Sequence, residues 1–84
     1  MGWFVYIAKC ADASYYTGIC TDLKRRISEH NDGKYKRAYT KGRAPVKLVY
    51  SETSENRSEA SKREIEIKNL RRVQKEKLIE SLVE

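Results

Sequence analysis

Two short apolar segments near the N-terminus carry the first structural signal. Trp3–Lys9 (WFVYIAK) and Tyr15–Cys20 (YYTGIC) are rich in aromatic and β-branched residues, a composition typical of strands. Cys10–Ser14, which lies between them, has the length of a hairpin connection. We therefore expect the chain to begin with two paired strands.

The register of this hairpin decides where its tyrosines point. If Cys10 pairs with Ser14, Tyr6 lies opposite Gly18, and paired residues share one face of the sheet. Tyr6 and Tyr16 then lie diagonally on the same face, and Gly18 leaves open space over Tyr6. A slip of one residue would move every side chain of a strand to the other face.

The next segment has the spacing of a short amphipathic helix. Thr21 or Asp22 can cap its start, and Asn31, in the sequence Asn-Asp-Gly, marks its end. Leu23 and Ile27 are one helical turn apart and form the predicted buried stripe.

The second half of the chain predicts one more strand and two helices. Val46–Ser51 (VKLVYS) has the composition of a strand. A helix begins at Asn56, with Glu59 as its capping-box partner, and runs to about Arg71. Val73–Leu82 forms the last helix.

These elements follow in the order strand, strand, helix, strand, helix, helix. This order favours an α+β fold in which helices pack against a three-stranded sheet. We expect residues 1–84 to form one domain, because 84 residues have room for one small core.

The composition argues against several classes of protein. No apolar run is long enough to span a bilayer, and the first residues lack the basic stretch of a secretory signal. We therefore expect a cytoplasmic protein that does not bind membranes. Cys10, Cys20 and a single histidine argue against a zinc knuckle and a disulfide scaffold, so both thiols are expected to be reduced and partly buried.

Positive charge is concentrated in one segment. The net charge is +6, and Lys34–Lys47 contains six Lys or Arg residues, two tyrosines and no acid. Basic side chains beside aromatic rings suit nucleic acid, which offers both phosphates and stacking surfaces, although an ordinary basic loop can have the same composition. The predicted nucleic-acid contacts in this segment are Lys34, Lys36, Arg37, Lys41 and Arg43.

Three more side chains add candidate chemistry to the two tyrosines. Arg26 and His30 are four residues apart and flank the buried stripe of the first predicted helix. Glu64 lies in the inward arc of the next helix, between Ala60 and Ile67, where a carboxylate is costly unless it is paired or binds a cation. These residues also have a purely structural interpretation. The tyrosines could be half-buried strand residues, and Arg26 and His30 could be ordinary residues at the rim of a helix. Glu64 could be a salt-bridge partner, with Arg26 as one candidate.

The paired tyrosine motifs resemble those of the GIY-YIG nuclease superfamily. The chain has FVY, nine residues, and then YTG. As in that superfamily, Arg26 follows the second tyrosine, Tyr16, by ten positions, His30 stands one turn later, and Glu64 lies in an A-x-x-x-E setting. The resemblance covers nearly all of the chain and is closest to the small single-domain GIY-YIG proteins of bacteria.

The resemblance implies a three-stranded antiparallel sheet flanked by helices, and hydrolysis of phosphodiester bonds with one divalent ion, Mg²⁺ or Mn²⁺. It implies Tyr6 as the base that activates water, Arg26 as a phosphate ligand and Glu64 as the metal ligand. It also implies that Gly18 lets the nucleic-acid backbone approach. The catalytic residues carried over are Tyr6, Tyr16, Arg26, His30 and Glu64.

The chain also departs from the superfamily pattern. Phe-Val-Tyr replaces Gly-Ile-Tyr, and Thr17 replaces the middle isoleucine of the second motif. Ile19 stands where some members have a lysine, and Asn69 is too close to Glu64 to match the functional asparagine that ends many of these domains. These departures leave the core set intact.

The function expected is that of a metal-dependent DNA endonuclease, acting in repair, recombination or the processing of single-stranded or branched DNA. We expect a monomer. The alternative is a nucleic-acid-binding module with the same fold and little or no cleavage, because no second domain is present to find a target. A protein partner could supply that targeting. A third interpretation is a small interaction protein that binds through its C-terminal helices.

Overall fold

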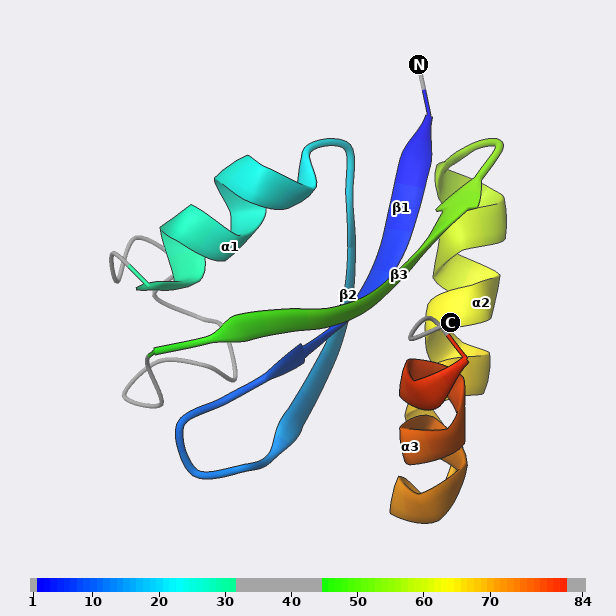
Figure 1. The fold of residues 1–84 in the computed structure, drawn as a ribbon. Coiled ribbons are helices and arrows are strands. Elements are labelled where there is room, and N and C mark those ends of the chain that lie inside the picture. Colours follow the sequence, from blue (N-terminus) through cyan, green and yellow to red (C-terminus); the bar gives the residue numbers. More distant parts are fainter. Residues whose placement is uncertain (1, 32–44, 82–84) are drawn as a thin grey trace.

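The computed structural model describes residues 2–31 and 45–81. Its elements are β1 (Trp3–Lys9), β2 (Tyr15–Cys20), α1 (Leu23–Asn31), β3 (Lys47–Ser54), α2 (Arg57–Lys68) and α3 (Arg72–Glu80). The three strands form one antiparallel sheet in the order β2-β1-β3, with β2 at one edge (Figure 1). The predicted fold class and element order are confirmed.

The hairpin between β1 and β2 has the predicted register. The Cys10 amide donates a hydrogen bond to the Ser14 carbonyl at 2.8 Å, and Tyr6 is paired with Gly18. Ala13 turns the chain with a φ of 71°, and its amide donates to the Cys10 carbonyl. Since side chains alternate along a strand, this register fixes which residues of β1 and β2 face the same side.

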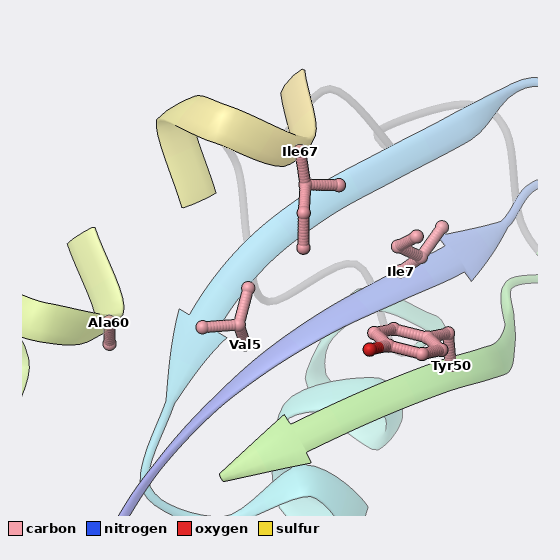
Figure 2. Packing of buried hydrophobic residues seen from close by; sticks show 5 residues of the cluster. All are labelled: Val5, Ile7, Tyr50, Ala60 and Ile67. Atoms are coloured by element: carbon pink, nitrogen blue, oxygen red, sulfur yellow. The ribbon is translucent and has the colours of Figure 1, made fainter. Parts of the chain in front are cut away.

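The helices cover both faces of the sheet, with α1 on one face and α2 and α3 on the other (Figure 1). The central strand β1 is therefore buried on both sides. Figure 2 shows the face under α2, where the buried cluster consists of Val5, Ile7, Tyr50, Ala60 and Ile67. The face under α1 holds a second cluster that includes Tyr6 and Ala8, against which Leu23 and Ile27 pack as predicted.

Local hydrogen bonds define where the helices start. The Asp22 carboxylate accepts from the Arg25 amide at 3.1 Å, so Asp22 rather than Thr21 caps α1. The Asn56 side chain accepts from the Glu59 amide at 2.9 Å and caps α2 as predicted.

Several element boundaries differ from the sequence-based expectation. β3 begins at Lys47 instead of Val46, and α3 begins at Arg72 instead of Val73, while its predicted end, Leu82, lies outside the described residues. β3 continues to Ser54 instead of ending at Ser51, because it pairs with β1 as far as Trp3. α2 ends at Lys68 and not near Arg71, where the backbone amide instead donates to the Gln74 side chain and begins α3. This turn lets the apolar side of α3 pack on the same core cluster as α2.

Cys10 and Cys20 are free thiols, and both are buried rather than partly buried as predicted. Among residues 2–31 and 45–81, none of the helices combines the length and apolar character needed to cross a membrane.

Candidate active site

A buried hydrogen bond between β1 and α1 forms the centre of the candidate site. The Tyr6 hydroxyl oxygen lies 3.0 Å from His30 Nε2, and the two residues are 0% and 3% exposed. Strand alternation turns Tyr6 toward α1. His30 follows the partly buried Ile27 by three residues, so helical spacing places it on the same side of α1.

The second tyrosine lies against this pair. The Tyr16 ring centroid is 6.1 Å from that of Tyr6 and 5.2 Å from that of His30. Tyr16 is half-buried, so it lies between the buried pair and the surface.

The structural role of Gly18 differs from the predicted one. A Cβ atom there would lie 2.7 Å from the Tyr6 hydroxyl oxygen and 3.0 Å from Tyr16 Cε2. The prediction of open space over Tyr6 is wrong, because the Tyr6 ring itself lies across Gly18 and fills that space. Gly18 therefore allows the two tyrosines to pack closely.

The contacts that hold Arg26 beside the pair include one to β2 and one within α1. Its Nη1 donates to the Ile19 carbonyl of β2 at 3.2 Å, and its Nε lies 3.4 Å from the Glu29 carboxylate. Its side chain is 24% exposed. The guanidinium is thus fixed in direction at the edge of the sheet and still reaches the surface.

Burial sets the protonation states of the central pair. Burial, and then the neighbouring Tyr16, raise the pKa of Tyr6 well above its usual value, and Arg26 offsets only part of this effect. Burial, and then Arg26, lower the pKa of His30, with Glu29 opposing them. At neutral pH Tyr6 is therefore protonated and His30 is neutral, and the Tyr6 hydroxyl donates to His30 Nε2 when the imidazole carries its proton on Nδ1.

Glu64 is the one predicted catalytic residue that this group does not include. It belongs to α2, which covers the opposite face of the sheet (Figure 1). Its side chain is 21% exposed, and the partner of its carboxylate within the described residues is Lys68, with Nζ at 3.6 Å. Arg26, which the sequence offered as its partner, is paired with Glu29 instead.

Arg26 and Glu64 nevertheless have one element in common, the edge strand β2. Arg26 reaches the backbone of β2 from α1, and α2 packs against β2 from the other face. A strand at the edge of a sheet is the place where side chains from both faces can reach the same molecule.

The described residues of the protein offer few metal ligands at this site, so the site suits only an ion that takes most of its ligands from water and substrate. The described part of the chain has no group of three His, Cys, Asp or Glu side chains arranged to hold a metal. The single carboxylate of Glu64 fits Mg²⁺ or Mn²⁺, which bind proteins through one or two carboxylates and take water and phosphate oxygens for the rest.

Two residues that the sequence analysis did not assign to the site contribute to the geometry. Glu29 pairs with Arg26, and its spacing of three residues from Arg26 is a visible signal. Asn31 has no such signal: its side chain accepts from the Val46 amide and donates to the Val46 carbonyl, which ties the end of α1 to the start of β3. The predicted contacts Lys34, Lys36, Arg37, Lys41 and Arg43 lie outside the described residues.

Comparisons with known proteins agree with this architecture. The family model for the GIY-YIG catalytic domain matches residues 2–77. The UPF0213 protein of Desulfotalea psychrophila is 53% identical over 79 residues, covering 94% of this chain and 72% of that protein. The UPF0213 protein of Staphylococcus epidermidis is 54% identical over 77 residues, covering 92% and 93%.

Two solved structures are also similar to this chain. The solution NMR structure of the UPF0213 protein of Bacillus halodurans has a TM-score of 0.59 and 44% identity, with coverage of 95% of this chain and 84% of that chain. The NMR structure of a protein from E. faecalis has a TM-score of 0.65 and 37% identity, with coverage of 98% and 86%.

Proposed function

Because the chain belongs to the GIY-YIG nuclease family, we propose that it is a metal-dependent endonuclease that hydrolyses phosphodiester bonds in DNA. Its place would be in repair, recombination or the processing of single-stranded or branched DNA. The observation that carries the proposal is the buried hydrogen bond between the protonated Tyr6 hydroxyl and neutral His30. It joins a candidate base to a neutral side chain that can take its proton.

This pair can take a proton from water without a free tyrosinate. Tyr6 passes its hydroxyl proton to His30 Nε2 while its oxygen receives a proton from the attacking water. His30 is able to accept because it is neutral at pH 7, although burial and Arg26 both disfavour its protonated form. Since both residues are buried in the free protein, the substrate has to expose the Tyr6 oxygen before the reaction.

Arg26 and Tyr16 are the members of the group nearer the surface. The Arg26 guanidinium stays charged at any physiological pH, and its contacts with Ile19 and Glu29 fix its direction. We assign it to the scissile phosphate, where fixed donors stabilise charge that develops in the transition state. Tyr16 then positions the phosphate or the water through its hydroxyl.

Glu64 would hold the metal ion from the α2 side of the β2 edge. When bound, the ion stabilises charge on the phosphate and on the leaving oxygen. Lys68 neutralises the carboxylate in the free protein and has to give up this contact.

The test is cleavage of labelled single-stranded, duplex and branched DNA with Mg²⁺ or Mn²⁺. We expect Tyr6→Phe and Glu64→Gln to lower the rate by about 100-fold or more. Tyr50→Phe and Glu66→Gln are matched controls, because Tyr50 is a buried tyrosine on the other face and Glu66 an exposed acid on the same helix. Cutting that survives both active-site variants would contradict the proposal.

A binding module with little or no cleavage is the second candidate. It is favoured by the burial of Tyr6 and by the pairing of Glu64 with Lys68 on the opposite face from His30. Such a module would bind DNA with an affinity that falls steeply with salt and does not change in Glu64→Gln. Binding without cutting by the wild-type protein on all three substrates would support it.

A further inference from the structure

Two lysines face each other at the hairpin end of the sheet. Lys9 at the end of β1 is paired with Lys47 at the start of β3, and both are exposed. Paired Cα atoms in an antiparallel sheet lie about 4.5–5.5 Å apart, and like charges directly opposite each other destabilise the pair. On its other side Lys9 is paired with Tyr15 of β2.

The first turn of α3 adds two more cations to this end. Arg72 stacks on the Tyr15 ring at 4.4 Å from the centroid and donates to the Ala13 carbonyl at 2.9 Å. Lys75 precedes the core-packed Leu78 by three residues, so it lies on the sheet-facing side of α3, and it is half-buried.

Few acids balance these four cations. Glu76 pairs with Arg72 at 3.4 Å, and the Asp12 carboxylate in the hairpin accepts from the amide and hydroxyl of Ser14. Within the described ranges, no ion pair joins Lys9 or Lys47 to a carboxylate. By contrast, Arg25, Arg26, Lys62, Arg63 and Lys68 all have acidic partners.

This cationic surface lies on the face opposite the candidate active site. Lys9 alternates with Ile7 and shares its face, which is the face covered by α2 and α3, whereas Tyr6 points toward α1. The surface is therefore not a part of the Tyr6–His30 group.

We propose that Lys9, Lys47, Arg72 and Lys75 form a second contact surface for the phosphate backbone of nucleic acid. The positive charges are spread across neighbouring strands and lie beside a half-buried tyrosine. This arrangement suits a nucleic-acid backbone, with its row of phosphates, better than a single small anion. The proposal rests on the proposed function, since it assigns this surface to DNA that extends beyond the scissile bond.

The test measures binding and does not depend on catalysis. Fluorescence anisotropy of a labelled single-stranded 20-mer, without divalent metal, is followed from about 50 to 300 mM NaCl for the wild type and for the double variant Lys9→Gln/Lys47→Gln. Lys62→Gln/Lys77→Gln is the matched control, because it removes the same charge from two other exposed lysines. Lys9→Arg/Lys47→Arg keeps the charge.

Loss of two phosphate contacts should make the slope of log K against log salt less steep by about 1.4, at roughly 0.7 per contact for a single strand. Affinity at 100 mM NaCl should fall on the order of tenfold. The Arg/Arg variant should bind like the wild type, and the control pair should change little.

The outcomes separate this inference from the proposed function. If the wild type binds and Lys9→Gln/Lys47→Gln behaves like the control pair, the second surface is wrong and the nuclease proposal stands. If the wild type fails to bind the 20-mer at any salt concentration, the second surface is wrong, and the cleavage assay with metal on the three substrates decides the proposed function separately.

Discussion

Gly18→Ala tests the packing of the two tyrosines, which is the feature of the site that the sequence predicted least well. The added Cβ would lie 2.7 Å from the Tyr6 hydroxyl oxygen, 2.9 Å from Tyr6 Cζ and 3.0 Å from Tyr16 Cε2. Tyr6 is completely buried and hydrogen-bonded to His30, so its ring cannot move aside without breaking that bond.

The size of the effect follows from three contributions. Overpacking a filled core costs about 1–3 kcal/mol, and loss of the hydrogen bond between Tyr6 and His30 costs about 1 kcal/mol. Replacing a strand glycine by alanine returns about 0.5–1 kcal/mol of backbone entropy. We therefore expect Gly18→Ala to lower the free energy of unfolding by about 2 kcal/mol.

Urea unfolding at pH 7, followed by circular dichroism, measures this difference. Gly2→Ala is the matched control, because a Cβ at Gly2 meets nothing within 4 Å. In a Tyr6→Phe background the Gly18→Ala change should cost less, since the closest contact is with the hydroxyl oxygen that phenylalanine lacks. Unchanged or increased stability of Gly18→Ala in the wild-type background would refute the packing argument.

Three further predictions concern titration and the tie between α1 and β3. Because burial lowers the pKa of His30, the unfolded chain takes up its proton first, and the free energy of unfolding should fall as pH drops below about 6.5. Urea unfolding at pH 7.5 and 5.5 should show this loss in the wild type and a smaller one in His30→Gln; an equal loss in both would contradict it. Burial raises the pKa of Tyr6 and Tyr50, so an absorbance titration at 295 nm should leave these two tyrosines un-ionised near pH 10 until the protein unfolds. Asn31→Ala removes both hydrogen bonds to the Val46 backbone and should lower the free energy of unfolding by about 1–3 kcal/mol in urea. Asn31→Asp keeps the acceptor and should cost less; equal stability of all three proteins would show that this tie is unimportant.

Local patterns predicted the part of the site that lies between the first three elements. Hairpin length set the pairing of Tyr6 with Gly18, and helical spacing put His30 beside the buried stripe of α1, where the structure buries it more deeply than a flanking position implies. Both inferences need only the period of a strand or a helix and a short connection, so tertiary structure had little opportunity to override them.

The placement of Glu64 shows where such patterns stop. Helical spacing correctly turned Ala60 and Ile67 of α2 inward. The spacing does not say which face of the sheet the helix covers. Both faces of this sheet are apolar at the central strand, so the apolar side of a helix can pack on either. The sequence could therefore predict an inward-facing carboxylate, but not that α2 and α1 lie on opposite faces.

This two-sided arrangement restricts where a single phosphate can meet all the proposed groups. Arg26 reaches the β2 backbone from one face, and Glu64 belongs to the helix that packs on β2 from the other. Side chains on opposite faces of the sheet can contact one phosphate only if that phosphate lies beside an exposed edge of the sheet. β2 is such an edge strand. Lys9 and Lys47 lie on the α2 face, so a strand of DNA bound there has to pass around the sheet to reach Tyr6. Cleavage that needs both Arg26 and Glu64 would thus place the scissile phosphate at this edge, and cleavage that needs Arg26 alone would place it on the α1 face.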